Sequence, residues 1–96
     1  MRYGQPMGYF VYVLACADRD GCRTYVGWTL DPDRRLAEHN GGTGARSTRG
    51  RVWAMIHVEE LGSRSEAMSR EWHLKRDRAF RRRLAAAWLD GEARRA

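Results

Sequence analysis

The sequence has no run of about 20 apolar residues, which is the length that a membrane-spanning helix needs. Its 2 cysteines, Cys16 and Cys22, are too few for a disulfide framework, and they do not complete a four-ligand zinc site. The N-terminus does not combine a charged region with an apolar stretch and a small-residue cleavage site. We therefore expect a cytoplasmic protein with no export signal and no membrane association.

Lysine is almost absent, since 17 of the 18 basic residues are arginine and only Lys75 is lysine. The 12 acidic residues leave a formal net charge of +6, so the expected class of partner is a polyanion. With 96 residues, of which 43% are hydrophobic, the chain is expected to form one compact domain with a modest core.

Three segments have the pattern of β-strands. Residues 9–16 are apolar on both alternating faces, which predicts a central strand covered on both sides. Residues 23–29 are β-branched and aromatic and follow the turn signal of residues 18–21, so we expect a hairpin with a loop of about five to seven residues. Residues 52–59 predict a third strand. Its alternation gives two faces, one with Val52, Ala54, Ile56 and Val58 and the other with Trp53, Met55 and His57.

Capping signals predict two helices. Asp31 and Pro32 fit an N-cap and a first helical residue, and the helix that they begin ends at residues 40–42. Residues 63–66 fit a capping box and begin a second helix, which continues to about residue 76.

A third helix is predicted over residues 78–89, and Asp90-Gly91 would end it. Its apolar side chains recur at every fourth position and would be buried: Phe80, Leu84 and Trp88. The resulting order of elements is ββαβαα.

Glu71 does not fit the helical pattern around it. Its neighbours three and four positions away are apolar: Ala67, Met68 and Leu74. A carboxylate on an apolar stripe is costly unless it is paired or binds a metal. The pattern leaves a second interpretation open, in which Glu71 lies at the margin of the stripe and pairs with Lys75 or Arg70.

Two further pairs place polar groups together. Arg35 and His39 are four residues apart on one helix and share a face, although a surface arginine beside a histidine at a helix C-terminus would have the same spacing. Tyr12 and Tyr25 lie on paired strands, where they are either site residues or core residues.

Two features of the hairpin are also informative. Gly27 weakens a strand, and such a glycine often marks a close approach by a ligand or another chain. Cys16 and Cys22 flank the turn and could face each other, and we interpret both as small buried thiols.

Arginines concentrate in the predicted third helix, where Asp77 is the one nearby acid. The run consists of Arg76, Arg78, Arg81, Arg82 and Arg83. A charge run is often a solvated helix face, but arginines in this number favour contact with phosphates. The glycine-rich loop over residues 41–51 adds Arg46 and Arg49 as further candidates.

Two tripeptides, Phe10-Val11-Tyr12 and Tyr25-Val26-Gly27, resemble the paired motifs that name the GIY-YIG nuclease superfamily. The first has Phe and Val in place of Gly and Ile, and the second differs only by Val for Ile. Arg35 lies 10 residues past Tyr25, where that family has its helical arginine. Glu71, followed by Leu74-Lys75, resembles the later helix that carries the metal-binding glutamate.

The resemblance covers about residues 9–83. Residues 33–40 and the loop Gly44-Ala45-Arg46 are similar to the small, stand-alone bacterial branch of the superfamily. It implies an α+β fold with a central three-stranded antiparallel sheet flanked by helices. We expect a domain over residues 9–90, preceded by an extension over residues 1–8 and followed by a tail over residues 91–96.

The resemblance also implies an activity, which is metal-dependent endonucleolytic hydrolysis of DNA, with branched or damaged DNA as a candidate substrate. Glu71 would bind Mg²⁺ or Mn²⁺ in a one-metal mechanism. Arg35 would stabilise the phosphoryl oxygens. Tyr12 would be the general base and Tyr25 would orient it, with His39 on the same face.

The sequence departs from the family in two ways. Some members have a lysine beside the second motif, where this chain has Trp28, so His39 is the substitute that could activate Tyr12. Many members also have an asparagine after the glutamate helix, and no asparagine follows Asn40. Two other functions therefore stay open: a nucleic-acid-binding module without cleavage, and a subunit that completes a partner's nuclease. A protein partner could also supply specificity.

Overall fold

The computed structural model describes residues 8–19 and 21–95 of the chain. The elements follow the predicted order ββαβαα, with one short 3₁₀ helix added between α1 and β3. They are β1 (Tyr9–Asp18), β2 (Gly21–Thr29), α1 (Pro32–Asn40), the 3₁₀ helix η1 (Arg46–Thr48), β3 (Ala54–Leu61), α2 (Arg64–Arg76) and α3 (Arg78–Arg95). The predicted α+β class is confirmed.

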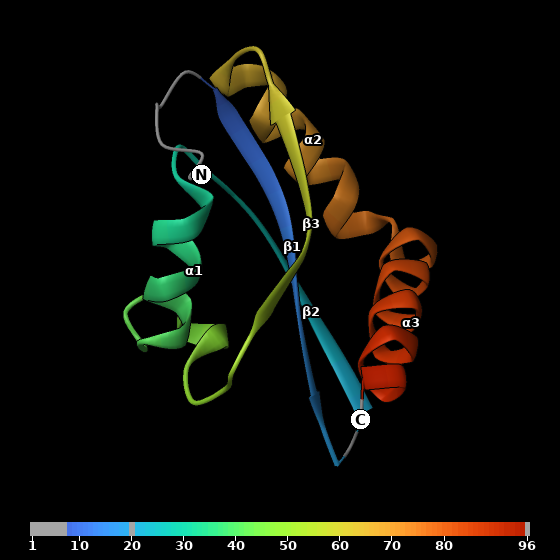
Figure 1. The fold of residues 1–96 in the computed structure, drawn as a ribbon. Coiled ribbons are helices and arrows are strands. Elements are labelled where there is room, and N and C mark those ends of the chain that lie inside the picture. Colours follow the sequence, from blue (N-terminus) through green and yellow to red (C-terminus); the bar gives the residue numbers. More distant parts are fainter. Residues whose placement is uncertain (1–7, 20, 96) are drawn as a thin grey trace.

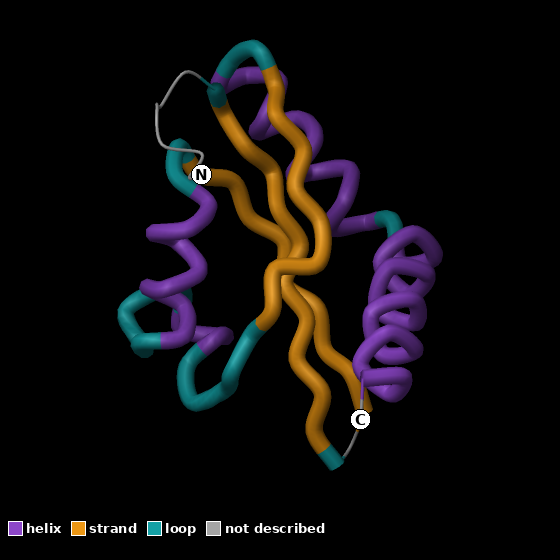
Figure 2. Tube along the Cα trace, in the orientation of Figure 1, coloured by secondary structure: helices purple, strands orange, loops and turns teal. Residues whose placement is uncertain are grey.

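The three strands form one antiparallel sheet in the order β2-β1-β3. Helix α1 covers one face of this sheet, and α2 and α3 cover the other (Figure 1 and Figure 2). The central strand β1 is buried from Phe10 to Cys16, as its two-sided apolar pattern predicts. β2 and β3 are therefore the two edge strands of the sheet.

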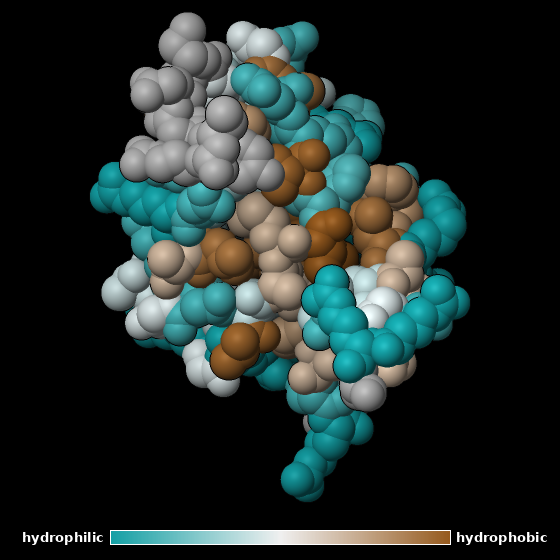
Figure 3. All heavy atoms as spheres, viewed as in Figure 1, coloured by the Kyte–Doolittle hydropathy of each residue, from teal (hydrophilic) through white to brown (hydrophobic). Residues whose placement is uncertain are grey.

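Each face of β1 contributes to a separate apolar cluster. Val11 and Val13 pack with Val26, Ala67 and Leu74 between the sheet and α2. On the opposite face the buried members of the α1-side cluster are Tyr12, Leu14, Cys16 and Trp53. Apolar side chains are visible between the two helical layers in Figure 3, whereas the outer helix surfaces are hydrophilic.

The predicted helix starts are confirmed. The side chain of Asp31 accepts a hydrogen bond from the Arg34 amide at 3.2 Å, and Pro32 is the first residue of α1. Ser63 accepts from the Glu66 amide at 3.1 Å at the start of α2. Within the described residues no helix has the length and apolar character to cross a membrane.

The hairpin is confirmed, but its predicted loop is too long. β1 continues to Asp18 and β2 begins at Gly21, whose φ of +128° allows a tight reversal. In this register Cys16 pairs with Arg23 and Ala17 pairs with Cys22. The two thiols therefore lie on opposite faces of the sheet, so the expectation that they face each other is wrong. Both are free, and Cys22 is only partly buried.

β3 does not follow the predicted alternation. The register places His57 opposite Val13 and Met55 opposite Leu14, so Ile56 is the extra residue of a β-bulge. As a result Ile56 packs on the α2 side while Val58 packs with Tyr12, and the prediction that they share a face is wrong. The strand also begins at Ala54 rather than at residue 52.

α3 is longer than predicted, because it continues through Asp90-Gly91 to Arg95. An ion pair between Arg94 and Asp90 at 3.0 Å, one helical turn apart, supports this last part. The three side chains expected to be buried are only half-buried: Phe80, Leu84 and Trp88. Ala85 is the buried residue of α3.

Candidate functional site

Tyr12 lies at the centre of β1, directly opposite Gly27 of β2. A Cβ atom added at Gly27 would lie 2.5 Å from the Tyr12 hydroxyl oxygen, so only glycine leaves room for the phenol at this position. The close approach expected at Gly27 is therefore made by Tyr12 itself. The sequence interpretation named a ligand or another chain as the usual cause of such a glycine and did not identify Tyr12.

The Tyr12 hydroxyl starts a chain of buried hydrogen bonds. It lies 2.8 Å from His39 Nε2, and His39 Nδ1 lies 2.9 Å from Thr48 Oγ1. Thr48 donates its one hydroxyl proton to the Ala45 carbonyl at 2.8 Å, so it must accept from His39 Nδ1–H. In the neutral imidazole Nε2 is then the acceptor, and Tyr12 donates to it. The donor and acceptor in each of these hydrogen bonds therefore follow from the hydroxyl of Thr48.

Burial favours this neutral form of His39. The side chain is fully buried, and burial, followed by the positive charge of Arg35, lowers its pKa below the ordinary value. A Cβ atom added at Gly44 would lie 2.5 Å from His39 Nδ1, so the loop after α1 also packs closely on the ring. Thr48 and the contact of Gly44 were not found from the sequence, because nothing in a glycine-rich loop marks one threonine as the partner of a distant histidine.

Tyr25 completes a cluster of three rings. Its ring centre lies 6.4 Å from that of Tyr12 and 5.0 Å from that of His39. Burial raises the pKa of Tyr12 to about 12, and the nearby Arg35 guanidinium opposes this rise. A free phenolate is therefore rare at neutral pH, and deprotonation of Tyr12 requires an acceptor such as His39.

Arg35 extends from α1 beside Tyr12, and its Nη1 donates to Glu38 Oε1 at 2.9 Å. Glu38 also lies 3.4 Å from Arg34 Nε, so one carboxylate holds two arginines, and Arg35 lowers the pKa of Glu38. A cavity of about 370 Å³ opens here between α1 and the end of β2. Its lining consists of Trp28, Thr29, Leu30, Asp31, Arg34, Arg35 and Glu38. The sequence interpretation did not identify Glu38.

Glu71 lies on α2 and is half-buried, with 23% of its side chain exposed. Its carboxylate lies 3.8 Å from Lys75 Nζ and near enough to Tyr12 to raise the pKa of the phenol further. Arg70 pairs with Glu59 instead. The apolar stripe around Glu71 is narrower than predicted, since Met68 is 49% exposed. Glu71 therefore sits at the margin of the stripe, beside Lys75.

The described residues contain no group of three or more His, Cys, Asp and Glu side chains that could enclose a metal ion. A single carboxylate fits Mg²⁺, which keeps most of its waters and commonly binds through one or two carboxylates. Glu71 meets this requirement, because its ion-pair partner Lys75 lies at the long distance of 3.8 Å.

The predicted phosphate-binding arginines lie in different settings. Arg81 is held as a cap for the end of α2, since it donates to the Leu74 and Lys75 carbonyls at 2.7 and 2.6 Å and to the Thr24 hydroxyl at 3.2 Å. Arg76 stacks on Trp72, with its Cζ atom 3.7 Å from the ring centre. Arg46 and Arg49 are exposed at η1, on either side of Thr48.

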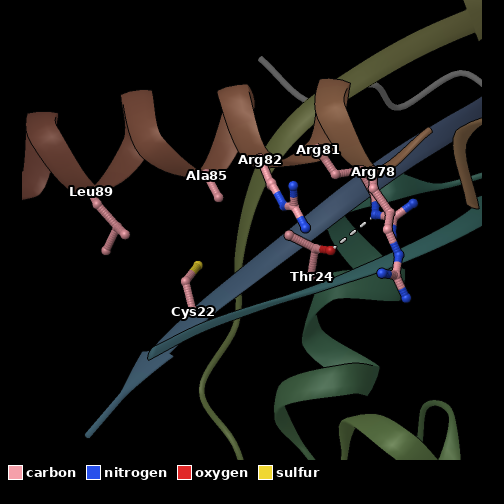
Figure 4. Close-up of a pocket in the computed structure, with 7 residues that line it drawn as sticks. All are labelled: Cys22, Thr24, Arg78, Arg81, Arg82, Ala85 and Leu89. Atoms are coloured by element: carbon pink, nitrogen blue, oxygen red, sulfur yellow. Dashed lines mark hydrogen bonds between the residues drawn. The ribbon is translucent and has the colours of Figure 1, made fainter. Parts of the chain in front are cut away.

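Arg78 and Arg82 extend from α3 toward β2 and line a cavity of about 330 Å³ (Figure 4). The other lining residues are Cys22, Thr24, Arg81, Ala85 and Leu89. Over the described part of the chain, neither Arg78 nor Arg82 forms an ion pair with an acid, whereas Arg94 and Arg95 of the same helix both do. The cavity therefore contains two guanidinium groups that are available to an anion.

The fold and these residues define a domain of the GIY-YIG type. Residues 8–84 match the family model described as the GIY-YIG catalytic domain, and the chain belongs to this family. The predicted resemblance is confirmed. Membership in a family of nuclease domains supports a nuclease-type function and an interaction with nucleic acid.

Among its relatives the chain is similar to proteins named UPF0213. A UPF0213 protein of Natronomonas pharaonis is 45% identical over 80 residues, which cover 81% of this chain and 91% of that protein. A UPF0213 protein of Enterococcus faecalis is 45% identical over 71 residues, 71% of this chain and 77% of that one. The solution NMR structure of a UPF0213 protein from Bacillus halodurans matches with 36% identity and a TM-score of 0.47, covering 84% of this chain and 85% of that one.

Proposed function

We propose that the protein is a metal-dependent endonuclease that hydrolyses phosphodiester bonds in DNA. The observation that carries this proposal is the series of hydrogen bonds from Tyr12 through His39 to Thr48, in which Tyr12 donates to a neutral imidazole. For a buried tyrosine with a purely structural role, any hydrogen-bond partner would satisfy the hydroxyl. Here the partner is a neutral imidazole that can accept a proton, beside an arginine that can bind a phosphate.

The proposed reaction is attack of water on phosphorus with loss of the leaving oxygen. A water proton passes to the Tyr12 oxygen while the Tyr12 proton passes to His39 Nε2, so no free phenolate is needed. The P–O bond to the leaving oxygen breaks, and that oxygen takes a proton from solvent. His39 then returns a proton to the Tyr12 oxygen while the Tyr12 hydroxyl proton passes to solvent, so both groups regain their starting protonation state. Tyr25, packed against both rings, would orient the hydroxyl.

Arg35 would bind the phosphoryl oxygens, where negative charge increases in the transition state. Its guanidinium is already held by Glu38, and Arg35 lines the cavity between α1 and the end of β2. Glu71 would hold Mg²⁺ or Mn²⁺. The bound cation would stabilise charge on the phosphoryl and leaving oxygens.

The DNA backbone would contact the exposed arginines outside the site. Arg78 and Arg82 would bind backbone phosphates in the cavity under α3, which they line. Arg46 and Arg49 lie close to the loop that holds His39. Arg76 would add charge from α2, and Arg81 would hold the arginine helix in place. We also propose that residues 9–90 are the nuclease domain, that it works in the cytoplasm on branched or damaged DNA, and that a protein partner supplies specificity.

A second function, nucleic-acid binding without cleavage, is favoured by two observations. Tyr12 has its pKa raised to about 12, and Trp28 stands where a lysine could otherwise assist it. In that case the ring cluster would be part of the core and the arginines alone would have a function.

One experiment separates these two functions. Wild type and Glu71→Ala are incubated with labelled duplex, single-stranded and branched DNA, with and without Mg²⁺ or Mn²⁺. Glu92→Ala, which removes an exposed carboxylate of α3, is the matched control. Cleavage by wild type and Glu92→Ala but not by Glu71→Ala supports the nuclease. Equal binding by all three with no cleavage in any metal contradicts it.

A further inference from the structure

One side of α2 carries large side chains that the fold leaves exposed. Met68 and Trp72 are 49% and 53% exposed and lie one helical turn apart. Arg76 follows one turn later, and its guanidinium stacks on the Trp72 ring. We refer to Met68, Trp72 and Arg76 as the α2 stripe. None of these side chains takes part in the proposed hydrolysis, and only Arg76 has been assigned a contact with the DNA backbone.

Contacts on both sides of α2 fix its rotation on the sheet. Ala67 and Leu74 are fully buried and face the strands. To one side Arg70 donates to Glu59 of β3 at 2.8 Å. To the other side Arg64 lies 5.5 Å from the ring centre of Trp28, which belongs to the edge strand β2. The helix therefore has a β3 side and a β2 side.

The α2 stripe begins on the β2 side, next to Glu71. With about 100° of rotation per residue, Glu71, Lys75 and Met68 follow one another around the helix on that side, and Trp72 comes next. The ion pair between Lys75 and Glu71 agrees with this order. Trp72 thus lies about 100° around the helix from the candidate metal ligand, on the accessible side of α2, with Lys75 and Met68 between them.

We propose that the α2 stripe stacks an unpaired nucleobase of the substrate, beside the phosphate bound by Arg35 and Glu71. The proposal rests on the proposed nuclease function. An exposed indole accepts the face of any base, and an arginine plane over it extends the stacking surface. A base inside a duplex is covered on both faces by its neighbours and cannot reach Trp72. The substrate class is therefore DNA with single-stranded nucleotides at the cleavage site.

Charge favours a nucleotide over an apolar protein segment as the occupant. Lys75 and Arg76 border the ring on the helix surface, and the whole chain has a formal net charge of +6. An apolar partner would remove the Arg76 guanidinium from water without a counterion and would also desolvate the ion pair between Lys75 and Glu71, which is costly. A nucleotide brings a phosphate to pair with these cations in the same contact that stacks its base.

The test measures binding separately from cleavage. Fluorescence anisotropy in the presence of a chelator gives the affinity of wild type, Trp72→Ala and Trp72→Phe for single-stranded and duplex DNA of equal length at one salt concentration. We expect Trp72→Ala to weaken single-strand binding about 5- to 100-fold, the range of one base–aromatic stack, and to leave duplex binding unchanged. Trp72→Phe should retain most of the affinity. Val52→Ala removes another exposed apolar residue and should have no effect.

Three results would overturn the proposal. They are an equal loss for single-stranded and duplex DNA, no loss for either, or a change in oligomeric state of Trp72→Ala on size-exclusion chromatography with light scattering. Failure of the proposed nuclease function looks different. A preference for single strands that depends on Trp72, with no cleavage in any metal, supports the stacking site and contradicts the nuclease.

Discussion

His39 Nε2 accepts the hydroxyl proton of Tyr12 across 2.8 Å, and the direction of this bond is set by Thr48 on the opposite side of the imidazole. Thr48→Val keeps the shape of the side chain but removes the acceptor for Nδ1–H, so the tautomer is no longer fixed. We expect cleavage to fall about 10- to 100-fold by analogy with other orienting groups, with little change in DNA affinity. Single-turnover kinetics beside anisotropy separates the two quantities.

Thr43→Val is the matched control, because Thr43 lies in the same loop but its hydroxyl bonds only to the exposed Glu38 carbonyl at 3.4 Å. His39→Gln should lose cleavage more completely than Thr48→Val, since the glutamine amide cannot take up the Tyr12 proton. A Thr48→Val variant with the cleavage rate of wild type would contradict the positioning role of Thr48.

The pH dependence of cleavage should follow His39. Burial and Arg35 lower the pKa of His39 below 6.5, so the acceptor form dominates at neutral pH. The cleavage rate should therefore stay high down to about pH 6.5 and fall below it, as Nε2 becomes protonated. The free energy of unfolding should also decrease as the pH falls below about 6.5, because the unfolded state binds a proton there that the folded state resists. A pH–rate profile under single-turnover conditions checks the first statement, and a rate that rises on acidification would contradict it.

Gly27→Ala should destabilise the protein and disturb the ring cluster together. The new methyl would lie 2.5 Å from the Tyr12 hydroxyl oxygen, which is bonded to His39 and cannot move away freely. We expect a loss of about 1–3 kcal/mol in the free energy of unfolding, measured by urea denaturation. Gly91→Ala is the control, since it has open space in the interior of α3 and should be neutral or stabilising by up to about 1 kcal/mol.

The sequence predicted the sheet, the helix starts and the family, because each depends on a local pattern of residues. The capping residues Asp31 and Ser63, for example, mark where two of the helices begin. It did not predict the bulge at Ile56, because an extra residue in β3 is set by pairing with β1 and leaves the apolar pattern intact. The role of Gly27 was also not predicted, because it too depends on how the strands pair. Which atom fills the space beside a glycine depends on the opposite strand, here on Tyr12.

Acid should destabilise the protein through Glu59. Two hydrogen bonds from Arg70, at 2.8 and 2.9 Å, hold the pKa of this carboxyl at about 2, below its ordinary value. Because the folded pKa is depressed, the stabilisation is present above about pH 4.5 and is lost as the pH falls toward 2. It amounts to about 3 kcal/mol at most. Arg70→Met should lower stability at pH 7 and flatten the dependence between pH 4.5 and 2, whereas equal pH slopes for variant and wild type would contradict this account.

The cavity under α3 can be tested through its own thiol. Cys22 lines this cavity and is partly exposed, whereas Cys16 is buried on the other face of the sheet, so N-ethylmaleimide should label Cys22 alone. If backbone phosphates bind Arg78 and Arg82, DNA should slow this labelling, and added salt should restore it as the phosphates dissociate. Mass spectrometry of peptides follows each cysteine separately.

The paired variants make the test specific. Arg82→Gln should weaken DNA binding and reduce the slope of log affinity against log salt by about 0.7 to 0.9, the contribution of one phosphate contact. Arg95→Gln removes an arginine at the end of the same helix that is already paired with Glu92 and should change the slope much less. Labelling of Cys22 at the same rate with and without saturating DNA would show that the backbone passes elsewhere, and would leave Arg46, Arg49 and Arg76 as the remaining candidates.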